Sequence, residues 1–167
     1  MTRDLSAWIE QHAVSSPDRV AIRFEGTEIS YRALHVRIQR AAGFLHNTHG
    51  VSLGDRVAYL GFNTPECVIV LFACAKLGAL YLPLNWRLAP PELDHVLGHA
   101  EPKVLISGSH HWDSAVGLVT GRSECTLIDC ENIVSTSEDC DTTLTESNFG
   151  GSLDTPLLLV FTSGTTG

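Results

Sequence analysis

The stretch LLLVFTSGTTG, residues 157–167, joins five apolar residues to six residues that are only Thr, Ser and Gly. A short, continuous apolar run such as PLLLVFT, residues 156–162, predicts a strand that is buried on both faces of a sheet. In open α/β sheets, ligands bind beyond the carboxyl ends of the strands. We therefore expect this strand to deliver the loop that follows it to a ligand site at the edge of a sheet.

The loop TSGTTG, residues 162–167, has the chemistry of an anion-binding turn. Its two glycines permit positive φ and let a ligand approach the backbone closely, and consecutive N–H groups in such a turn form a concave nest for anions. Its hydroxyl groups add hydrogen-bond donors without adding charge. No G-x-x-x-x-G-K-[ST] run occurs, so the loop is not a Walker A motif. Phosphate binding is favoured over a plain linker, and the predicted phosphate-binding residues are Thr162, Ser163, Gly164, Thr165, Thr166 and Gly167.

From Arg56 onward, apolar strands alternate with segments of helical pattern. The strands are predicted at the runs RVAYLGF, ALYLPLN, KVLIS and CTLID. Helices are predicted to start at Thr64-Pro65 and at Pro90, and a weaker helix is predicted over 111–119. This alternation predicts an α/β fold with a mostly parallel sheet flanked by helices. The residues directly after the strands are candidates for the ligand edge, and they include Asn63, Asn85, Ser107 and Asp129.

The sequence before Arg56 predicts smaller elements. These are a surface helix over 4–14, two short strands over 20–24 and 27–30, and a helix that Ser30 caps and Gly50 ends. The apolar stripe of the last helix consists of Leu34, Ile38, Ala41, Ala42 and Leu45. Residues 131–155 are polar, acidic and rich in Ser and Thr, which predicts a long surface excursion with little structure of its own.

Length, charge and cysteine content narrow the class of protein. The 167 residues suit one domain or a piece of a larger one, and the net charge of −8 argues against non-specific nucleic-acid binding. Five cysteines without a C-x-x-C pair indicate reduced thiols, and no signal peptide is visible, so a cytoplasmic protein is expected. The apolar region 67–84 contains Lys76, Gly78 and Pro83, which favours a buried helix and strand over a transmembrane segment.

Several motifs together resemble one family. FTSGTTG, residues 161–167, is similar to the phosphate-loop signature of the adenylate-forming superfamily, which includes acyl-CoA synthetases, peptide-synthetase adenylation domains and luciferases. ISYRAL (29–34), GDRVAYLGFNTPE (54–66) and AKLGALYLPLNWRLAPPEL (75–93) resemble further motifs of that superfamily in the same order. The resemblance covers about residues 5–107 and 155–167, and it implies the N-terminal portion of the large domain of such an enzyme.

The resemblance implies a two-step reaction. A fatty or other carboxylic acid attacks the α-phosphorus of ATP with Mg²⁺, and a thiol, commonly that of coenzyme A, then takes the acyl group from the acyl-adenylate. The loop 162–167 would hold the β- and γ-phosphates. PLNWRL, residues 83–88, resembles acyl-CoA synthetases in particular, and Arg87 would lie near the nucleotide phosphates of coenzyme A. The alternative is that Arg87 is an exposed turn residue or pairs with Glu92.

The family's other functional parts would lie after Gly167: the substrate pocket, the magnesium-binding residue and a C-terminal domain with a catalytic lysine. We therefore expect 1–167 to be an incomplete N-terminal part of the AMP-binding domain, without a catalytic residue and inactive alone, with the loop 162–167 poorly held. Two alternatives stay open. One is an adenylation domain that loads the thiol of a carrier protein, and the other is a non-catalytic α/β module.

The sequence contains a histidine pair with a spacing that occurs in metal sites. His95 and His99 lie one helical turn apart, a spacing that can bind zinc. No Glu follows His95 as in H-E-x-x-H, and no third ligand is evident, so a surface role is favoured and no metal site is predicted. The loop pair His110-His111 is interpreted in the same way.

Overall fold

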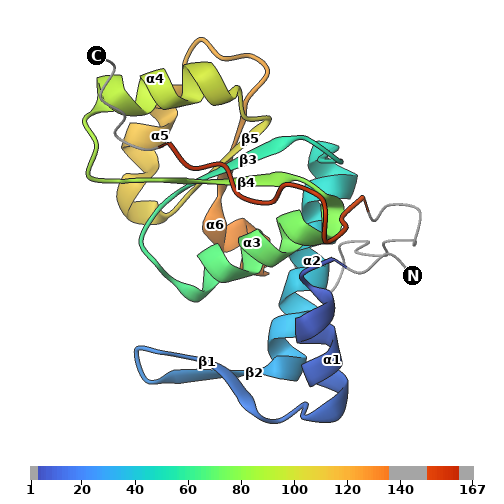
Figure 1. The fold of residues 1–167 in the computed structure, drawn as a ribbon. Coiled ribbons are helices and arrows are strands. Elements are labelled where there is room, and N and C mark those ends of the chain that lie inside the picture. The colour runs from blue at the N-terminus through green and yellow to red at the C-terminus, as the bar shows by residue number, and fades with distance from the viewer. Residues whose placement is uncertain (1–3, 136–149, 162–167) are drawn as a thin grey trace.

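The computed structural model describes residues 4–135 and 150–161 of the chain (Figure 1). An antiparallel hairpin and its flanking helices come first, followed by a region in which strands and helices alternate. The helices are α1 (Ala7–Ser15), α2 (Tyr31–His49), α3 (Pro65–Leu77), α4 (Pro90–Ala100), the 3-10 helix η1 (Ser109–His111), α5 (Trp112–Val119) and α6 (Cys130–Ser135). The strands are β1 (Val20–Phe24), β2 (Thr27–Ser30), β3 (Arg56–Leu60), β4 (Leu80–Leu84), β5 (Val104–Ser107) and β6 (Thr126–Asp129).

The main sheet is parallel throughout, in the order β4-β3-β5-β6. Alternate side chains of each strand point to opposite faces. Val57 and Tyr59 of β3 therefore enter one core cluster, with residues of α2, α3 and α6, while Ala58 and Leu60 enter the other, with residues of α4 and α5. Helices cover both faces (Figure 1), which explains why the strands read as continuous apolar runs and confirms the predicted α/β class.

The local signals for helix ends are mostly confirmed. The backbone N–H of Ala33 donates to Ser30 Oγ at 3.2 Å, and Gly50 and Gly78 end α2 and α3 with φ of 64° and 70°. The helix predicted to start at Thr64-Pro65 begins at Pro65, but the Thr64 hydroxyl does not cap it. Thr64 Oγ1 instead lies 3.3 Å from the hydroxyl of Tyr59 at the end of β3.

The segment before the terminal loop is not the doubly buried strand that its composition predicts. Residues 157–159 run parallel beside β4 with a single bridge: Tyr81 N–H donates to Leu157 O at 2.7 Å, and Leu159 N–H donates to Tyr81 O at 3.0 Å. Leu158 and Val160 remain 56% and 55% exposed. The segment lies at the edge of the described sheet, with no further described strand on its outer side, so only one of its edges is paired.

The range 131–155, predicted as a surface excursion, begins with a helix. α6 covers Cys130–Ser135 and places Ile133 in the core, 1% exposed, although its other residues are mostly polar. Residues 136–149 lie outside the described part of the chain. A helix of six residues carries too short a periodic pattern to be recognised by sequence alone.

Two glycines then bring the chain back against α3. Gly151 N–H donates to the carbonyl of Lys76 at 3.3 Å, and a Cβ atom on Gly151 would lie 1.8 Å from the carbonyl oxygen of Ala75. The close approach of two backbones therefore requires glycine at this position.

No described helix has the length and apolar composition needed to cross a bilayer. The described cysteines, Cys67, Cys74, Cys125 and Cys130, are free thiols, as predicted.

We expect Gly151→Ala to destabilise the fold. The added methyl group overlaps the Ala75 carbonyl, so the chain must shift away from α3, at a cost of about 1–3 kcal/mol in the free energy of unfolding. Urea unfolding of both proteins measures the difference.

The matched control is Gly117→Ala, because Gly117 is exposed inside α5 and has open space around its Cβ position. The control should be neutral or stabilising by up to about 1 kcal/mol. Equal free energies of unfolding for the two variants would contradict the close packing.

Candidate functional site

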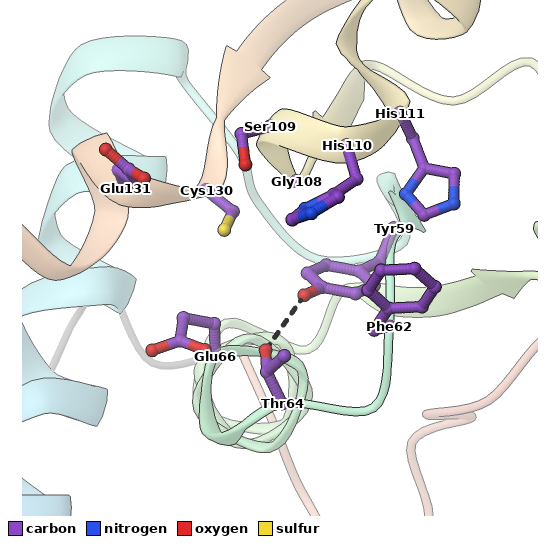
Figure 2. A pocket seen from close by; sticks show the side chains of 10 residues that line it. All are labelled: Tyr59, Phe62, Thr64, Glu66, Gly108, Ser109, His110, His111, Cys130 and Glu131. Atoms are coloured by element: carbon purple, nitrogen blue, oxygen red, sulfur yellow. Dashed lines mark hydrogen bonds between the residues drawn. The ribbon is translucent and has the colours of Figure 1, made fainter. Parts of the chain in front are cut away.

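A cavity of about 490 Å³ opens at the carboxyl ends of β3, β5 and β6 (Figure 2). It lies at the edge of the sheet where the sequence predicted a ligand site. Its walls come from the end of β3 and the start of α3, from the turn after β5, and from the start of α6. The lining residues are Tyr59, Phe62, Thr64, Glu66, Gly108, Ser109, His110, His111, Cys130 and Glu131.

The polar residues predicted at the strand ends do not line this cavity. Three of them build the turns that shape it or its surroundings. Asn85 Oδ1 accepts from the N–H of Arg87 at 3.1 Å, the Ser107 hydroxyl donates to Gly108 O at 3.1 Å, and Asp129 Oδ1 accepts from the N–H of Glu131 at 2.9 Å. The lining is formed by their neighbours, which were missed because the sequence does not show which side of a turn faces the cavity.

The titratable hydroxyl and thiol inside the cavity are held in their neutral forms. Burial raises the pKa of Tyr59 above its usual value and raises the pKa of the Cys130 thiol to about 11. Burial, helped by the neighbouring His110, lowers the pKa of His111, and its Nδ1 is buried without a partner. The neutral phenol of Tyr59 and the neutral thiol of Cys130 are poor nucleophiles, so these two groups are suited to forming hydrogen bonds with a ligand.

An aromatic group forms the rim between the ends of β3, β4 and β5. The ring of Phe62 meets the rings of Trp86 and His111 edge to face, with centroids 5.1 and 4.8 Å apart. Arg87 lies over Trp86, with its guanidinium carbon 4.3 Å from the ring centroid. Glu92, the alternative partner considered for Arg87, instead accepts from the N–H of Ala89 at 2.8 Å and caps α4.

The predicted phosphate loop, Thr162 to Gly167, lies outside the described residues. The segment that leads to it runs parallel to β4, so the segment and β4 point toward the same edge of the sheet. That edge also carries Trp86 and Arg87, which follow β4. Arg87 follows β4, and the segment that leads to the loop runs beside β4, so both lie at the same edge of the sheet. Neither Arg87 nor the described part of that segment lines the 490 Å³ cavity.

Metal-binding side chains do not gather in the described ranges. Within residues 4–135 and 150–161, no group of three or more His, Cys, Asp or Glu residues could hold a metal ion.

Comparisons with known proteins cover almost the whole chain. The family model of the AMP-binding enzymes matches residues 9–167. The chain is 38% identical over 170 residues to indoleacetate–CoA ligase of Aromatoleum aromaticum, covering 98% of this chain and 33% of that protein. It is 39% identical over 163 residues to feruloyl-CoA synthase of an Amycolatopsis species, covering 98% and 31%.

The chain is also similar to a carrier-protein ligase and to a solved N-terminal domain. The chain is 32% identical over 157 residues to the fatty acid–[acyl-carrier-protein] ligase ScoC of Streptomyces coeruleorubidus, covering 93% of this chain and 30% of that protein. The solved N-terminal domain of FACL13 from Mycobacterium tuberculosis superposes with a TM-score of 0.79 at 28% identity, covering 100% and 42%. The chain spans about a third of the length of the curated relatives.

The raised pKa of Cys130 predicts slow alkylation. At pH 8 a thiol with a pKa of about 11 is ionised roughly a hundredfold less than an ordinary thiol with a pKa near 9. A more basic thiolate is also a better nucleophile, which offsets part of this difference. Iodoacetamide should therefore modify Cys130 in the native protein at least about tenfold more slowly than in urea, and peptide mapping measures both rates.

The same shift predicts a pH dependence of stability. Because the folded-state pKa lies above the unfolded value, Cys130 favours folding below about pH 9, and this contribution is lost between about pH 9 and 11. Cys130→Ser, which does not ionise in this range, should lose less stability over that interval. Equal alkylation rates in the native and unfolded states would contradict the assignment.

Proposed function

Because the chain belongs to the AMP-binding enzyme family, we propose that the full-length protein is an ATP-dependent ligase that joins a carboxylic acid to coenzyme A. The observation that carries this proposal is the similarity of 98% of the chain to relatives named as CoA ligases. The range that the family model matches, residues 9–167, spans the loop TSGTTG and the strand-and-turn region around Arg87.

The proposed reaction has two steps. In the first, an oxygen of the carboxylate attacks the α-phosphorus of ATP, the bond from that phosphorus to the bridging oxygen breaks, and pyrophosphate leaves. In the second, the sulfur of coenzyme A attacks the acyl carbon, AMP leaves, and the thiol proton passes to solvent. The products are a thioester, AMP and pyrophosphate, so atoms and charge balance.

The chain's own contribution to this reaction is binding. We expect the hydroxyl and N–H groups of Thr162 to Gly167 to hold the β- and γ-phosphates, because converging donors stabilise the charge on the departing pyrophosphate. Mg²⁺ would enter with ATP as the counter-ion of its phosphates. We expect Arg87 to contact the nucleotide phosphates of coenzyme A. Its guanidinium group lies over Trp86, and Glu92 accepts from Ala89 N–H instead of pairing with it.

No residue of the described chain is proposed as an acid, base or nucleophile. The neutral thiol of Cys130 and the neutral phenol of Tyr59 support this view. We therefore expect the 167 residues alone to form no acyl-adenylate. We also expect a cytoplasmic location, which the free thiols of the described cysteines support.

A second candidate acceptor is the thiol of a carrier protein. The relative ScoC, named as a ligase of fatty acids and acyl-carrier protein, favours it. The two acceptors share the first step and differ in the second, so only the second half-reaction separates them.

Thr165→Ala in the full-length protein should weaken ATP binding. A hydrogen bond to a charged group contributes about 1.5–3 kcal/mol, so the KM for ATP in ATP–pyrophosphate exchange should rise at least about tenfold. Thr27→Ala is the matched control, since Thr27 is exposed on β2. An unchanged KM for ATP in Thr165→Ala would contradict the assignment of the loop.

Arg87→Ala should affect only the second half-reaction. Loss of a charged contact to phosphate should raise the KM for coenzyme A about tenfold and leave ATP–pyrophosphate exchange unchanged. Arg87→Lys, which retains the charge, should recover part of the loss. Transfer to a carrier protein with no transfer to coenzyme A would overturn the CoA assignment and favour the second candidate.

A further inference from the structure

We propose that His95 and His99, on the exposed face of α4, form a two-histidine site for a late divalent transition-metal ion such as Zn²⁺ or Cu²⁺. The site is independent of the proposed ligase activity. α4 packs on the face of the sheet opposite to α3 and α6, while the cavity at the carboxyl edge draws its walls from the starts of those two helices.

The two imidazoles are already close. Residues four apart on a helix lie on the same face, and the ring centroids of His95 and His99 are 4.2 Å apart. Both side chains are exposed, so an ion can reach them without rearrangement of the core. Two nitrogens bound to one zinc ion at about 2.0–2.1 Å lie roughly 3 Å apart, a separation of the same order as that of the two rings.

The hydrogen bond of His99 to the backbone sets the ring tautomer that a metal ligand needs. His99 Nδ1 lies 2.9 Å from the carbonyl oxygen of His95. A carbonyl oxygen only accepts, so Nδ1 must carry the hydrogen, and Nε2 keeps its lone pair for a metal ion. A histidine that donates its other ring N–H to a backbone carbonyl is the usual arrangement of metal ligands.

The charged neighbours of the pair are engaged elsewhere. The Glu92 carboxylate caps the start of α4 through Ala89 N–H, and Asp94 pairs with Arg122 at 2.8 Å. Neither carboxylate holds the imidazoles, and the arginine is neutralised by Asp94. The ion would therefore have two protein ligands and complete its coordination with water, which suits imidazole-preferring ions in the order Cu²⁺ above Zn²⁺ and excludes Mg²⁺.

The sequence alone favoured a surface role because no third ligand was evident. The structure does not add a third ligand within the described residues. It adds the short separation of the rings and the tautomer of His99, which the spacing in the sequence could not give.

Calorimetric titration of the full-length protein with ZnCl₂ and with CuCl₂ at pH 7.5 tests the proposal. His95→Gln and His99→Gln should each weaken a binding event at least tenfold, and MgCl₂ should give no such event. His110→Gln is the matched control, because His110 lies next to His111 in η1 and not one helical turn from another histidine. Long-range ¹H–¹⁵N spectra should show a metal-induced shift of His99 Nε2.

The outcomes are distinct. Zinc and copper affinities that are unchanged in both His95→Gln and His99→Gln would overturn the proposal, as would an equal loss in His110→Gln. Circular dichroism and urea unfolding of the variants serve as the folding control, and we expect wild-type behaviour because both side chains are exposed.

Discussion

The parallel register of four strands is the constraint on which the rest of the structure depends. β3 pairs with β4 on one side and β5 on the other, so Leu60 lies opposite both Leu84 and Ser107. Every strand therefore ends at the same edge, and every following turn contributes to one surface. The cavity, the aromatic rim and Arg87 all result from that single arrangement, as does the direction of the segment that leads to Thr162.

Much of the fold follows from local signals in the sequence. Ser30, Gly50 and Gly78 mark helix ends because capping and positive φ depend on a few neighbouring atoms. The parallel α/β class follows from apolar runs that need cover on both faces. The family is likewise indicated by the resemblance of a few motifs, in their order along the chain, to those of known enzymes, and the match over residues 9–167 confirms it.

The sequence was less informative where the outcome depends on tertiary contacts. The run 157–161 shows that its residues are apolar, but not that the described sheet pairs only one of its edges. Ile133 anchors a helix in a stretch that reads as polar, and Asn85, Ser107 and Asp129 build turns while their neighbours face the ligand edge. The hydrogen bond that fixes the tautomer of His99 is equally a property of the folded helix.

For the full-length protein, we propose activation of a carboxylic acid through an adenylate and transfer of the acyl group to coenzyme A. The most direct measurement is the product stoichiometry of the full-length protein with ATP, coenzyme A and a panel of aliphatic and aromatic acids, by mass spectrometry. We expect AMP, pyrophosphate and an acyl-CoA thioester in equal amounts. Formation of ADP and phosphate, or of AMP without any thioester of coenzyme A, would contradict it.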